Sequence, residues 1–363
     1  SSASQLATLA ELVNSDDEAI REEYNDKYYL LTADIDLSDY GKNYREGKGW
    51  IPIGKDGSTP FRGDFEGGGH TITGLYINDE TLNYAGLFGC IENDGSVQNL
   101  GLEDVNITGQ DYVGGLVGCY RGTTTDDNRK IENCYAIGVV SGNDNVGGLV
   151  GYSQSGKIEN CYTTSTVNGN DYVGGLVGFI YEIGVIKNCY TTGNASGRCY
   201  VGGIIGIDQT DSLSGEISHC YSAAVVNGAD YVGGIAGFIS INGKLKNCIA
   251  LNPLINAPDT SDINIGRIAG VSNGNLAFNY SFSRMKVNGQ TMANGARDDI
   301  NGENVNIEQV FDPNFWTNAE FWGEIWDKTV WIIEKGKLPI LANLPGQSDD
   351  GGLYLTPQNI AWA

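Results

Sequence analysis

One glycine-rich phrase recurs along the chain, and this repetition limits the folds open to it. The phrase reads DYVGGLVG at 111–118 and DNVGGLVG at 144–151. It returns as DYVGGLVG at 171–178, CYVGGIIG at 199–206 and DYVGGIAG at 230–237. A repeat of about 30 residues indicates a solenoid, a propeller or another repeat array.

A second phrase alternates with the first and narrows the choice. It reads IENCY at 131–135 and 158–162, IKNCY at 186–190, ISHCY at 217–221 and LKNCI at 245–249. The runs between the two phrases are short and β-branched, without a helical period. A propeller blade needs roughly 40 residues or more, which is longer than this unit. The chain is therefore predicted to be all-β, a right-handed parallel β-helix.

Stacked coils explain why the same residue types return at each height. Coils of a β-helix lie about 4.8 Å apart, so the valines of the first phrase should form one inward column. Glycine is expected where the backbone leaves no room for a Cβ atom. Asparagine tolerates a sharp corner better than other non-glycine residues. We therefore predict an asparagine column at a corner, followed by a column of buried cysteines.

The two phrases together resemble the GLUG motif, named for its Gly-Leu-any-Gly core. The lead-in FRGDFEGGGHTITGLYI at 61–77 and the ending WIIEKGKLPIL at 331–341 are also similar to segments that flank such repeats. The resemblance implies a bacterial surface or secreted protein of adhesin-like type. It also extends to bacterial immunoglobulin A proteases, in which the repeats lie apart from the metallopeptidase domain. The implied location is extracellular or at the cell surface of a bacterium.

The resemblance and the open ends of a solenoid suggest four segments, because uncapped ends would pair with other chains. Residues 1–49 should hold a cap helix over 4–14, N-capped by Ser4, and a lead-in strand. Residues 50–285 should form the coils, 286–345 an aromatic-rich C-terminal cap, and 346–363 a tail or linker. We expect a monomer with capped ends.

Charge excludes some partners. The chain carries 45 acidic and 22 basic residues, a net charge of −23. A polyanion repels phosphate backbones, so nucleic acid is not an expected partner. No apolar run is long enough to span a membrane, and no signal peptide is recognised in the sequence. The expected partner is an extracellular glycan or a host protein.

The residues of common hydrolytic centres are missing or scattered. A zinc protease of the H-E-x-x-H type needs two histidines one helical turn apart, whereas His70 and His219 lie far apart in the sequence. The stretch GVSNG at 270–274 matches a nucleophile elbow but lacks a following helix pattern, so we read it as a chance match. The eight cysteines are expected to be free and mostly buried. No catalytic residue and no metal ligand set is predicted, and the chain is not expected to be an enzyme.

An acidic column is the first candidate site. It would present a ligand face or a calcium ladder, and calcium is the one cofactor considered. The other interpretation is a solvated turn in which each carboxylate accepts nearby backbone N–H groups. The column consists of Asp111, Asp144, Asp171 and Asp230.

A tyrosine column is the second candidate site. Stacked rings on an outer wall could hold sugar rings, or they could only stack on one another. The column consists of Tyr112, Tyr172, Tyr200 and Tyr231. Together the two columns favour a non-catalytic scaffold or adhesin-like module that presents a wall or loops for glycan or protein binding. The alternative is a carbohydrate-active β-helix enzyme, a polysaccharide lyase or glycoside hydrolase that uses surface carboxylates.

Overall fold

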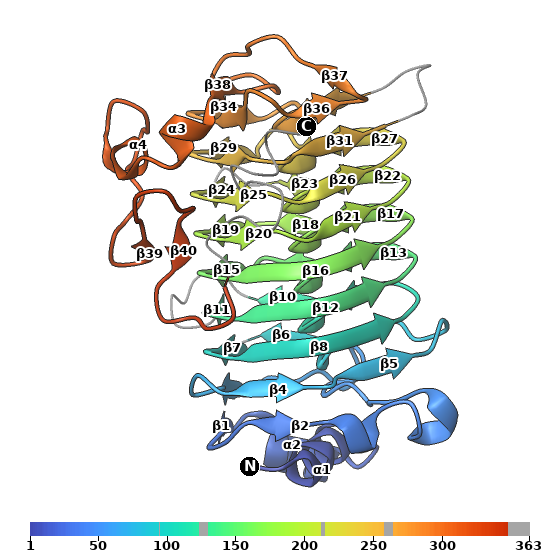
Figure 1. Cartoon of the computed structure of the whole chain (residues 1–363). Coiled ribbons are helices and arrows are strands. Elements are labelled where there is room, and N and C mark those ends of the chain that lie inside the picture. The colour runs from blue at the N-terminus through green and yellow to red at the C-terminus, as the bar shows by residue number, and fades with distance from the viewer. Residues whose placement is uncertain (94, 123–129, 212–214, 258–263, 348–363) are drawn as a thin grey trace.

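The chain folds into a right-handed parallel β-solenoid, which confirms the predicted fold class (Figure 1). This computed structural model describes residues 1–93, 95–122, 130–211, 215–257 and 264–347. The strands nearest the viewer run from left to right while the chain climbs from the N-terminal end, which sets the handedness. Most of the expected tail at 346–363 lies outside the described residues.

One coil shows how the sequence makes four walls. Strand β15 (Lys157–Glu159) ends before a corner at Asn160, and β16 (Tyr162–Asn168) then forms the long wall. A turn leads to β17 (Asp171–Gly174), the glycine pair makes the next corner, and β18 (Val177–Glu182) completes the coil. Each strand pairs in parallel with its counterpart one coil away, so every wall becomes a sheet.

Two of these sheets contain the first and the last strand of each coil. The nine-stranded sheet contains β1 (Tyr28–Leu30), β3 (Asp64–Glu66), β7 (Ser96–Gln98), β11 (Ile131–Glu132), β15 (Lys157–Glu159), β19 (Val185–Lys187), β24 (Glu216–Ser218), β29 (Lys244–Lys246) and β34 (Asn275–Ala277). The seven-stranded sheet contains β6 (Phe88–Asn93), β10 (Val117–Gly122), β14 (Val150–Gln154), β18 (Val177–Glu182), β23 (Ile205–Thr210), β28 (Ala236–Ile239) and β33 (Ala269–Ser272).

The other two sheets contain the second and third strands of each coil and meet at the corner where the candidate site lies. The six-stranded sheet contains β9 (Val113–Gly114), β13 (Asp144–Gly147), β17 (Asp171–Gly174), β22 (Cys199–Gly202), β27 (Asp230–Gly233) and β32 (Ile265–Gly266). The sixteen-stranded sheet contains β2 (Ile35–Asp36), β4 (Thr71–Thr73), β5 (Tyr76–Asn78), β8 (Gly101–Thr108), β12 (Tyr135–Ser141), β16 (Tyr162–Asn168), β20 (Tyr190–Thr191), β21 (Asn194–Ser196), β25 (Tyr221–Ser222), β26 (Val225–Asn227), β30 (Ile249–Ala250), β31 (Leu254–Asn256), β35 (Tyr280–Phe282), β36 (Lys286–Val287), β37 (Gln290–Thr291) and β38 (Glu303–Val305).

The predicted valine column forms the inner face of the six-stranded sheet. Val146 pairs in register with Val113 on one side and with Val173 on the other. Val173 pairs with Val201, which pairs with Val232. All five side chains are fully buried, so the repeated valine provides a continuous apolar core along the axis.

The glycine pair is required by close contacts. A Cβ atom added to Gly174 would lie 1.9 Å from the carbonyl oxygen of Val177 in the same corner. A Cβ atom added to Gly175 would lie 2.1 Å from the carbonyl oxygen of Gly203 in the next coil. Neither glycine has a positive φ. The left-handed residue near this corner is instead the one before the valine, such as Tyr172 with a φ of 59°.

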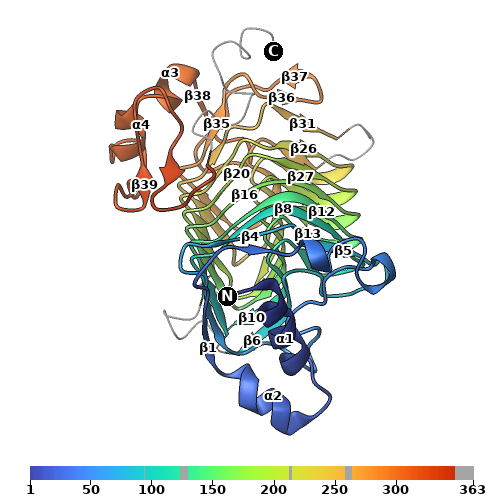
Figure 2. The same cartoon turned by 60° about the horizontal axis from the view of Figure 1, so that its bottom comes forward.

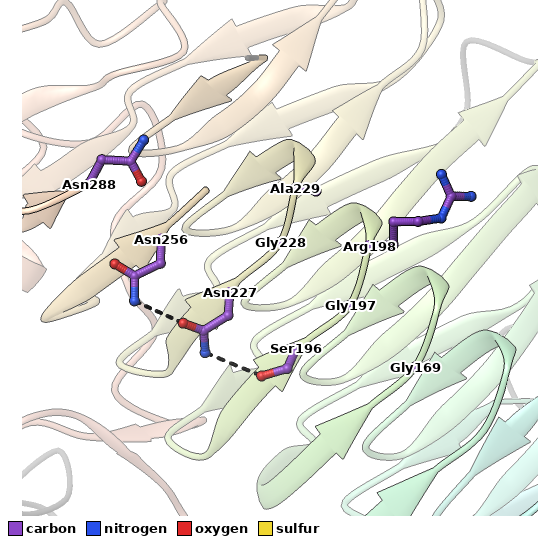
Figure 3. A pocket seen from close by; sticks show the side chains of 9 residues that line it. All are labelled: Gly169, Ser196, Gly197, Arg198, Asn227, Gly228, Ala229, Asn256 and Asn288. Atoms are coloured by element: carbon purple, nitrogen blue, oxygen red, sulfur yellow. Dashed lines mark hydrogen bonds between the residues drawn. The ribbon is translucent and has the colours of Figure 1, made fainter. Parts of the chain in front are cut away.

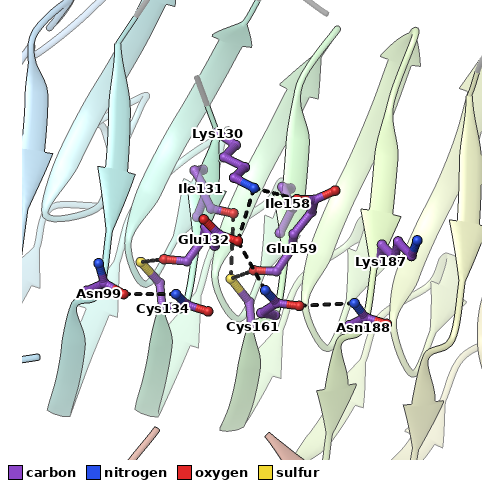
Figure 4. Close-up of polar contacts among 12 residues, drawn as sticks. Asn99, Lys130, Ile131, Glu132, Cys134, Ile158, Glu159, Cys161, Lys187 and Asn188 are labelled. Atoms are coloured by element: carbon purple, nitrogen blue, oxygen red, sulfur yellow. Dashed lines mark hydrogen bonds and ion pairs between the residues drawn. The ribbon is translucent and has the colours of Figure 1, made fainter. Parts of the chain in front are cut away.

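The predicted asparagine corner is also present. Asn133, Asn160 and Asn188 all have φ values between 51° and 53°, in the left-handed region. Asn188 Nδ2 donates to Asn160 Oδ1 at 3.1 Å, whereas Asn160 Nδ2 donates to Glu132 Oε1 at 3.1 Å, so the contacts along the axis include a carboxylate as well as amides (Figure 4). His219 takes the same left-handed position in its coil, with a φ of 52°.

The cysteine that follows each corner residue is buried, as predicted. All eight cysteines are free thiols, and only Cys199 is partly exposed. The thiol of Cys161 donates to the carbonyl oxygen of Glu159 at 3.0 Å, and the other members of the column make equivalent contacts (Figure 4). The column therefore fills the core beside the corner and forms no disulfide.

A helix covers the N-terminal end of the stack, but its cap differs from the prediction. Helix α1 (Ala3–Val13) buries Leu6, Leu9 and Val13. Its N-cap is Ser2, and Ser4 lies inside the helix. Ser2 has an extended backbone, and its Oγ accepts from Gln5 N at 3.3 Å, which Ser4 cannot do from a helical position. Helix α2 (Glu18–Asn25) and the 3-10 turns η1 (Ser38–Tyr40) and η2 (Arg45–Gly47) follow.

The aromatic C-terminal region lies along the flank of the stack (Figures 1 and 2). It contains α3 (Ile307–Val310), α4 (Pro313–Thr317) and a hairpin of β39 (Trp331–Ile332) and β40 (Ile340–Leu341). It covers a second tyrosine column, which follows the buried cysteines and whose rings are buried and stacked: Tyr135, Tyr162, Tyr190 and Tyr221. The hydroxyls of the last three donate to the covering segment, as Tyr221 does to Pro339 O at 2.9 Å.

The last coil ends differently from the others. Arg267 stands where the other coils have the second glycine, and only 1% of it is exposed. Its guanidinium donates to Asn304 Oδ1 at 2.5 Å and to Gly302 O at 3.0 Å. Strand β38 pairs with β35 and continues the sixteen-stranded sheet beyond this point.

The glycine contacts predict a large loss of stability for Gly174→Ala. The added methyl group would overlap a backbone oxygen, so the free energy of unfolding should fall by at least about 3 kcal/mol. Urea unfolding followed by circular dichroism measures this change. Thr164→Ala, at an exposed position of β16 in the same coil, should change the value by less than about 0.5 kcal/mol. Equal stability of the two variants would contradict the steric explanation.

A buried carboxyl group in the core predicts a pH dependence of stability. Asp208 lies between Ile180 and Ile239 in the inner column of the seven-stranded sheet and is 2% exposed. Burial raises the pKa of Asp208 to about 6, against the hydrogen bonds that it accepts from Thr210. The folded state therefore binds more protons than the unfolded chain between about pH 4 and 6. Stability should fall as the pH rises through this window.

Asp208→Asn removes the titrating group and keeps an acceptor for Thr210. At pH 7 the variant should be more stable than the parent by about 2–3 kcal/mol, and the fall between pH 4 and 6 should be reduced. Urea unfolding at several pH values measures both effects. Asp211→Asn, at an exposed position nearby, serves as the control. An unchanged pH profile in Asp208→Asn would contradict the assignment.

Candidate functional site

An open groove follows the corner between the sixteen-stranded and six-stranded sheets (Figure 3). It has a volume of about 1030 Å³ and crosses several coils. A glycine follows each of the strands β16, β21 and β26, because the turn lies against the valine column: a Cβ atom on Gly169 would lie 2.6 Å from Val173 Cγ2. The residues that line it are Gly169, Ser196, Gly197, Arg198, Asn227, Gly228, Ala229, Asn256 and Asn288. We call it the amide groove.

A ladder of side chains lines one side of the amide groove. Asn256 Nδ2 donates to Asn227 Oδ1 at 2.9 Å, and Asn227 Nδ2 donates to Ser196 Oγ at 3.2 Å (Figure 3). Asn288 Nδ2 donates to Ala257 O at 2.8 Å. Each amide has two N–H donors and one oxygen with two lone pairs. The ladder therefore fixes the orientation of the amides and leaves them further donors and acceptors for a ligand.

The lining of the amide groove is close to neutral. None of its nine residues is an aspartate, glutamate, histidine or cysteine. The single charge belongs to Arg198, whose guanidinium pairs with the carboxylate of Asp171. Arg198 Nε also donates to Asn170 Oδ1 at 3.2 Å. The groove can form hydrogen bonds with a ligand, but its lining has no side chain suited to general acid or base chemistry.

The predicted acidic column lies at the same corner and links the coils. Asp111 Oδ1 accepts from Asp144 N at 3.1 Å and from Asn143 Nδ2 at 3.0 Å. Asp144 Oδ1 accepts from Asp171 N in the same way, at 3.1 Å. Each of these backbone N–H groups belongs to the next coil and not to the aspartate's own turn. The carboxylates therefore hold successive turns in register.

The remaining acidic positions vary this pattern. Asp230 Oδ1 accepts from Asn264 N at 3.2 Å and from Asn264 Nδ2 at 3.0 Å. Asp171 pairs with Arg198. In the coil between those of Asp171 and Asp230, Cys199 replaces the aspartate. Within the part of the chain that the structure describes, no three His, Cys, Asp or Glu side chains gather as a metal site. Calcium binding by the column stays a prediction.

The predicted tyrosine column lies beside the acidic column. Its members are half-buried, and each has a left-handed backbone, with φ between 53° and 59°. The rings of Tyr172 and Tyr200 stack at 5.2 Å between centroids, and those of Tyr200 and Tyr231 at 4.4 Å. Tyr84 belongs to the same column, since its ring stacks on Tyr112 at 5.0 Å. Sequence reasoning missed it, although the degenerate phrase YAGLFG at 84–89 places a tyrosine at this position.

The residues considered for hydrolysis lie apart. His70 Nδ1 lies 3.1 Å from Asp34 Oδ1 near the N-terminal end. His219 is buried under the C-terminal region, where its Nε2 lies 3.1 Å from Glu324 O, and burial lowers its pKa. Ser272 ends β33 and is followed by β34, so the G-x-S-x-G match has no helix after it.

These features define the class of protein: a capped β-solenoid that presents a polar and aromatic corner. The GLUG motif model matches residues 142–168 and 169–196, which are two consecutive coils. These two coils therefore carry the GLUG motif that the sequence indicated. In the described part of the chain, no helix is long and apolar enough to cross a membrane.

Three known proteins are similar to parts or all of the chain. Halomucin of Haloquadratum walsbyi is 39% identical over 124 residues, which are 34% of this chain and 1% of halomucin. A "Putative Gly-rich membrane protein" of Evansella cellulosilytica is 41% identical over 108 residues, which are 29% of this chain and 12% of that protein. The chain thus spans a small part of either relative.

The third similarity is to a solved structure. The crystal structure of a "putative immunoglobulin A1 protease" from Bacteroides ovatus aligns over 94% of this chain and 91% of that chain, with a TM-score of 0.59. The two sequences are 23% identical. The likeness therefore concerns the fold.

The contacts of the acidic column predict the effect of two substitutions. Asp144→Ala removes the acceptor for Asp171 N and Asn170 Nδ2, so it should lower the free energy of unfolding by about 1–2 kcal/mol. Asp144→Asn keeps an oxygen at this position, so it should lower the free energy of unfolding by less than Asp144→Ala does. Chelation of calcium should leave the melting temperature of the parent unchanged, because Asp111, Asp144 and Asp230 already accept hydrogen bonds. Calcium-dependent stabilisation that Asp144→Ala abolishes would contradict this account. Differential scanning calorimetry measures these effects.

Proposed function

We propose that this chain is a non-catalytic extracellular or cell-surface module whose amide groove binds a neutral glycan. The observation that carries the proposal is the hydrogen-bonded ladder of Ser196, Asn227 and Asn256 along an open groove, which Asn288 also lines. Hydroxyl-rich ligands need donors and acceptors at regular positions, and side-chain amides offer both. The ladder repeats once per coil, about every 4.8 Å, so it suits a chain of repeating units.

Charge supports a neutral ligand. The net charge of −23 disfavours an acidic polysaccharide, and the one arginine of the groove is already paired with Asp171. The names of the halomucin and membrane-protein relatives support a place at the cell surface. An adhesin-like role, with a host glycan or a glycoprotein as partner, follows from this proposal.

Catalysis is not part of the proposal. The lining of the amide groove lacks the pair of carboxyl groups that glycoside hydrolysis commonly uses. The Bacteroides ovatus protein is named for protease activity, but the histidines of this chain, His70 and His219, lie in separate regions. Binding without turnover accounts for the groove more simply.

Substitution of the ladder tests the proposed function. The purified chain should bind a subset of neutral glycans on an array, and Asn227→Ala combined with Asn256→Ala should weaken this binding at least about tenfold. Asn168→Ala is the matched control, because Asn168 ends the neighbouring strand β16 but does not line the groove. Unchanged binding by the double variant would refute the assignment of the groove. Release of new reducing or unsaturated ends would favour the enzyme alternative.

A further inference from the structure

The tyrosine column has one missing ring. Tyr84 and Tyr112 stack in two successive coils, and Tyr172, Tyr200 and Tyr231 stack in three others. Asn145 takes the position in the coil between these two groups, with the same left-handed backbone at a φ of 57°. The register of the neighbouring valines places this coil directly between those of Tyr112 and Tyr172. The column is therefore open at Asn145.

The interruption at Asn145 spans the height of one ring. Two coil steps separate Tyr112 from Tyr172, a distance of about 9.6 Å at the usual spacing of strands. Neighbouring rings in the intact parts of the column lie between 4.4 and 5.2 Å apart. A compact group in the opening would thus contact the ring on each side at about the distance that the tyrosines keep from one another.

Two further rings form the side of this opening. The ring of Tyr152 meets Tyr112 edge-on at 5.6 Å, and the ring of Phe179 meets Tyr172 edge-on at 5.4 Å. Tyr152 and Phe179 stack on one another at 5.4 Å. Four aromatic rings therefore surround the opening. We call the set of Tyr112, Asn145, Tyr152, Tyr172 and Phe179 the aromatic slot.

The polar groups at the aromatic slot favour a positive ligand. Burial raises the pKa of Tyr172, and the nearby carboxylates of Asp171 and Asp144 raise it further. Asp171 Oδ1 is buried without a hydrogen-bond partner in the described structure. The side-chain amide of Asn145 is half-buried and also has no partner among the described residues. Arg198 and Arg121, the cations close by, are already paired with Asp171 and Glu92.

We propose that the aromatic slot binds an alkylated ammonium group of the choline type. The faces of aromatic rings attract cations whose centre lies within about 6 Å of the ring centroid, and several rings around one site recognise quaternary ammonium. A cation midway between Tyr112 and Tyr172 would lie about 4.8 Å from each ring. The negative charge of the corner adds to this attraction. None of the slot residues lines the amide groove, so this site is independent of the proposed glycan site.

Small ligands test the charge requirement. Isothermal titration of the purified chain with tetramethylammonium and choline should show binding at one site, with a dissociation constant on the order of millimolar. The uncharged isostere of choline, 3,3-dimethyl-1-butanol, should bind at least about tenfold more weakly. Equal affinity for choline and its isostere would overturn the proposal. So would binding of methyl glucoside at the slot in place of choline.

A substitution at position 145 tests whether choline binds in the aromatic slot. Asn145→Tyr should supply the missing ring, keep the fold and reduce choline binding at least about tenfold, because other coils already hold a tyrosine there. Asn168→Ala, which alters the corner outside the slot, is the control and should bind choline like the parent. Unchanged choline binding by a folded Asn145→Tyr variant would overturn the proposal. Loss of choline binding with glycan binding intact would support it and separate it from the proposed function.

Phosphocholine and a trimethyl-lysine peptide then distinguish the sources of the ammonium group. Affinity equal to that of choline for both ligands would show that the slot reads the ammonium group alone. Tighter binding of one would identify its carrier, a lipid headgroup or a modified protein. Failure of both while choline binds would restrict the site to small ammonium compounds. Each of these outcomes supports the ammonium site, and absence of binding by tetramethylammonium, choline, phosphocholine and the trimethyl-lysine peptide refutes it.

Discussion

The structure depends on the close approach of one backbone turn to the next. Parallel coils satisfy their N–H and C=O groups only at the spacing of strands in a sheet, about 4.8 Å. At the corner after each buried valine this spacing leaves no volume for a side chain, so the chain has Gly174 and Gly175 and their equivalents there. The repeated phrase is thus first a condition for stacking, and only its outer positions are free to serve binding.

This condition explains why the fold could be predicted and where prediction stopped. The valine, asparagine and cysteine columns follow from the repeat, because identical coils place identical residues at identical heights. The left-handed tyrosines could not be foreseen, since a bulky residue rarely adopts a positive φ. The position of the C-terminal region was also hidden, because its contacts, such as Tyr221 with Pro339, join a repeated position to a segment without repeats.

The candidate site was predictable only in part. The aspartate and tyrosine columns were visible as spacing, and the structure places them at one corner. The amide groove was missed because Ser196, Asn227 and Asn256 end short strands whose sequences vary between coils. The aromatic slot was missed because a gap in a column has a meaning only in three dimensions. In both cases the residues of the candidate site differ between coils, and the repeat pattern alone does not identify such positions.

Arg267 shows how such a departure ends the solenoid. At this position a side chain points to the place where another coil would lie, and in the inner coils a Cβ atom there would meet a carbonyl oxygen at 2.1–2.5 Å. The guanidinium instead binds Asn304 and Gly302, which close the last turn. A further parallel coil at this position would have to displace a buried cation, which disfavours continuation of the stack. The residue that closes the last turn thereby also disfavours further strand pairing at this edge.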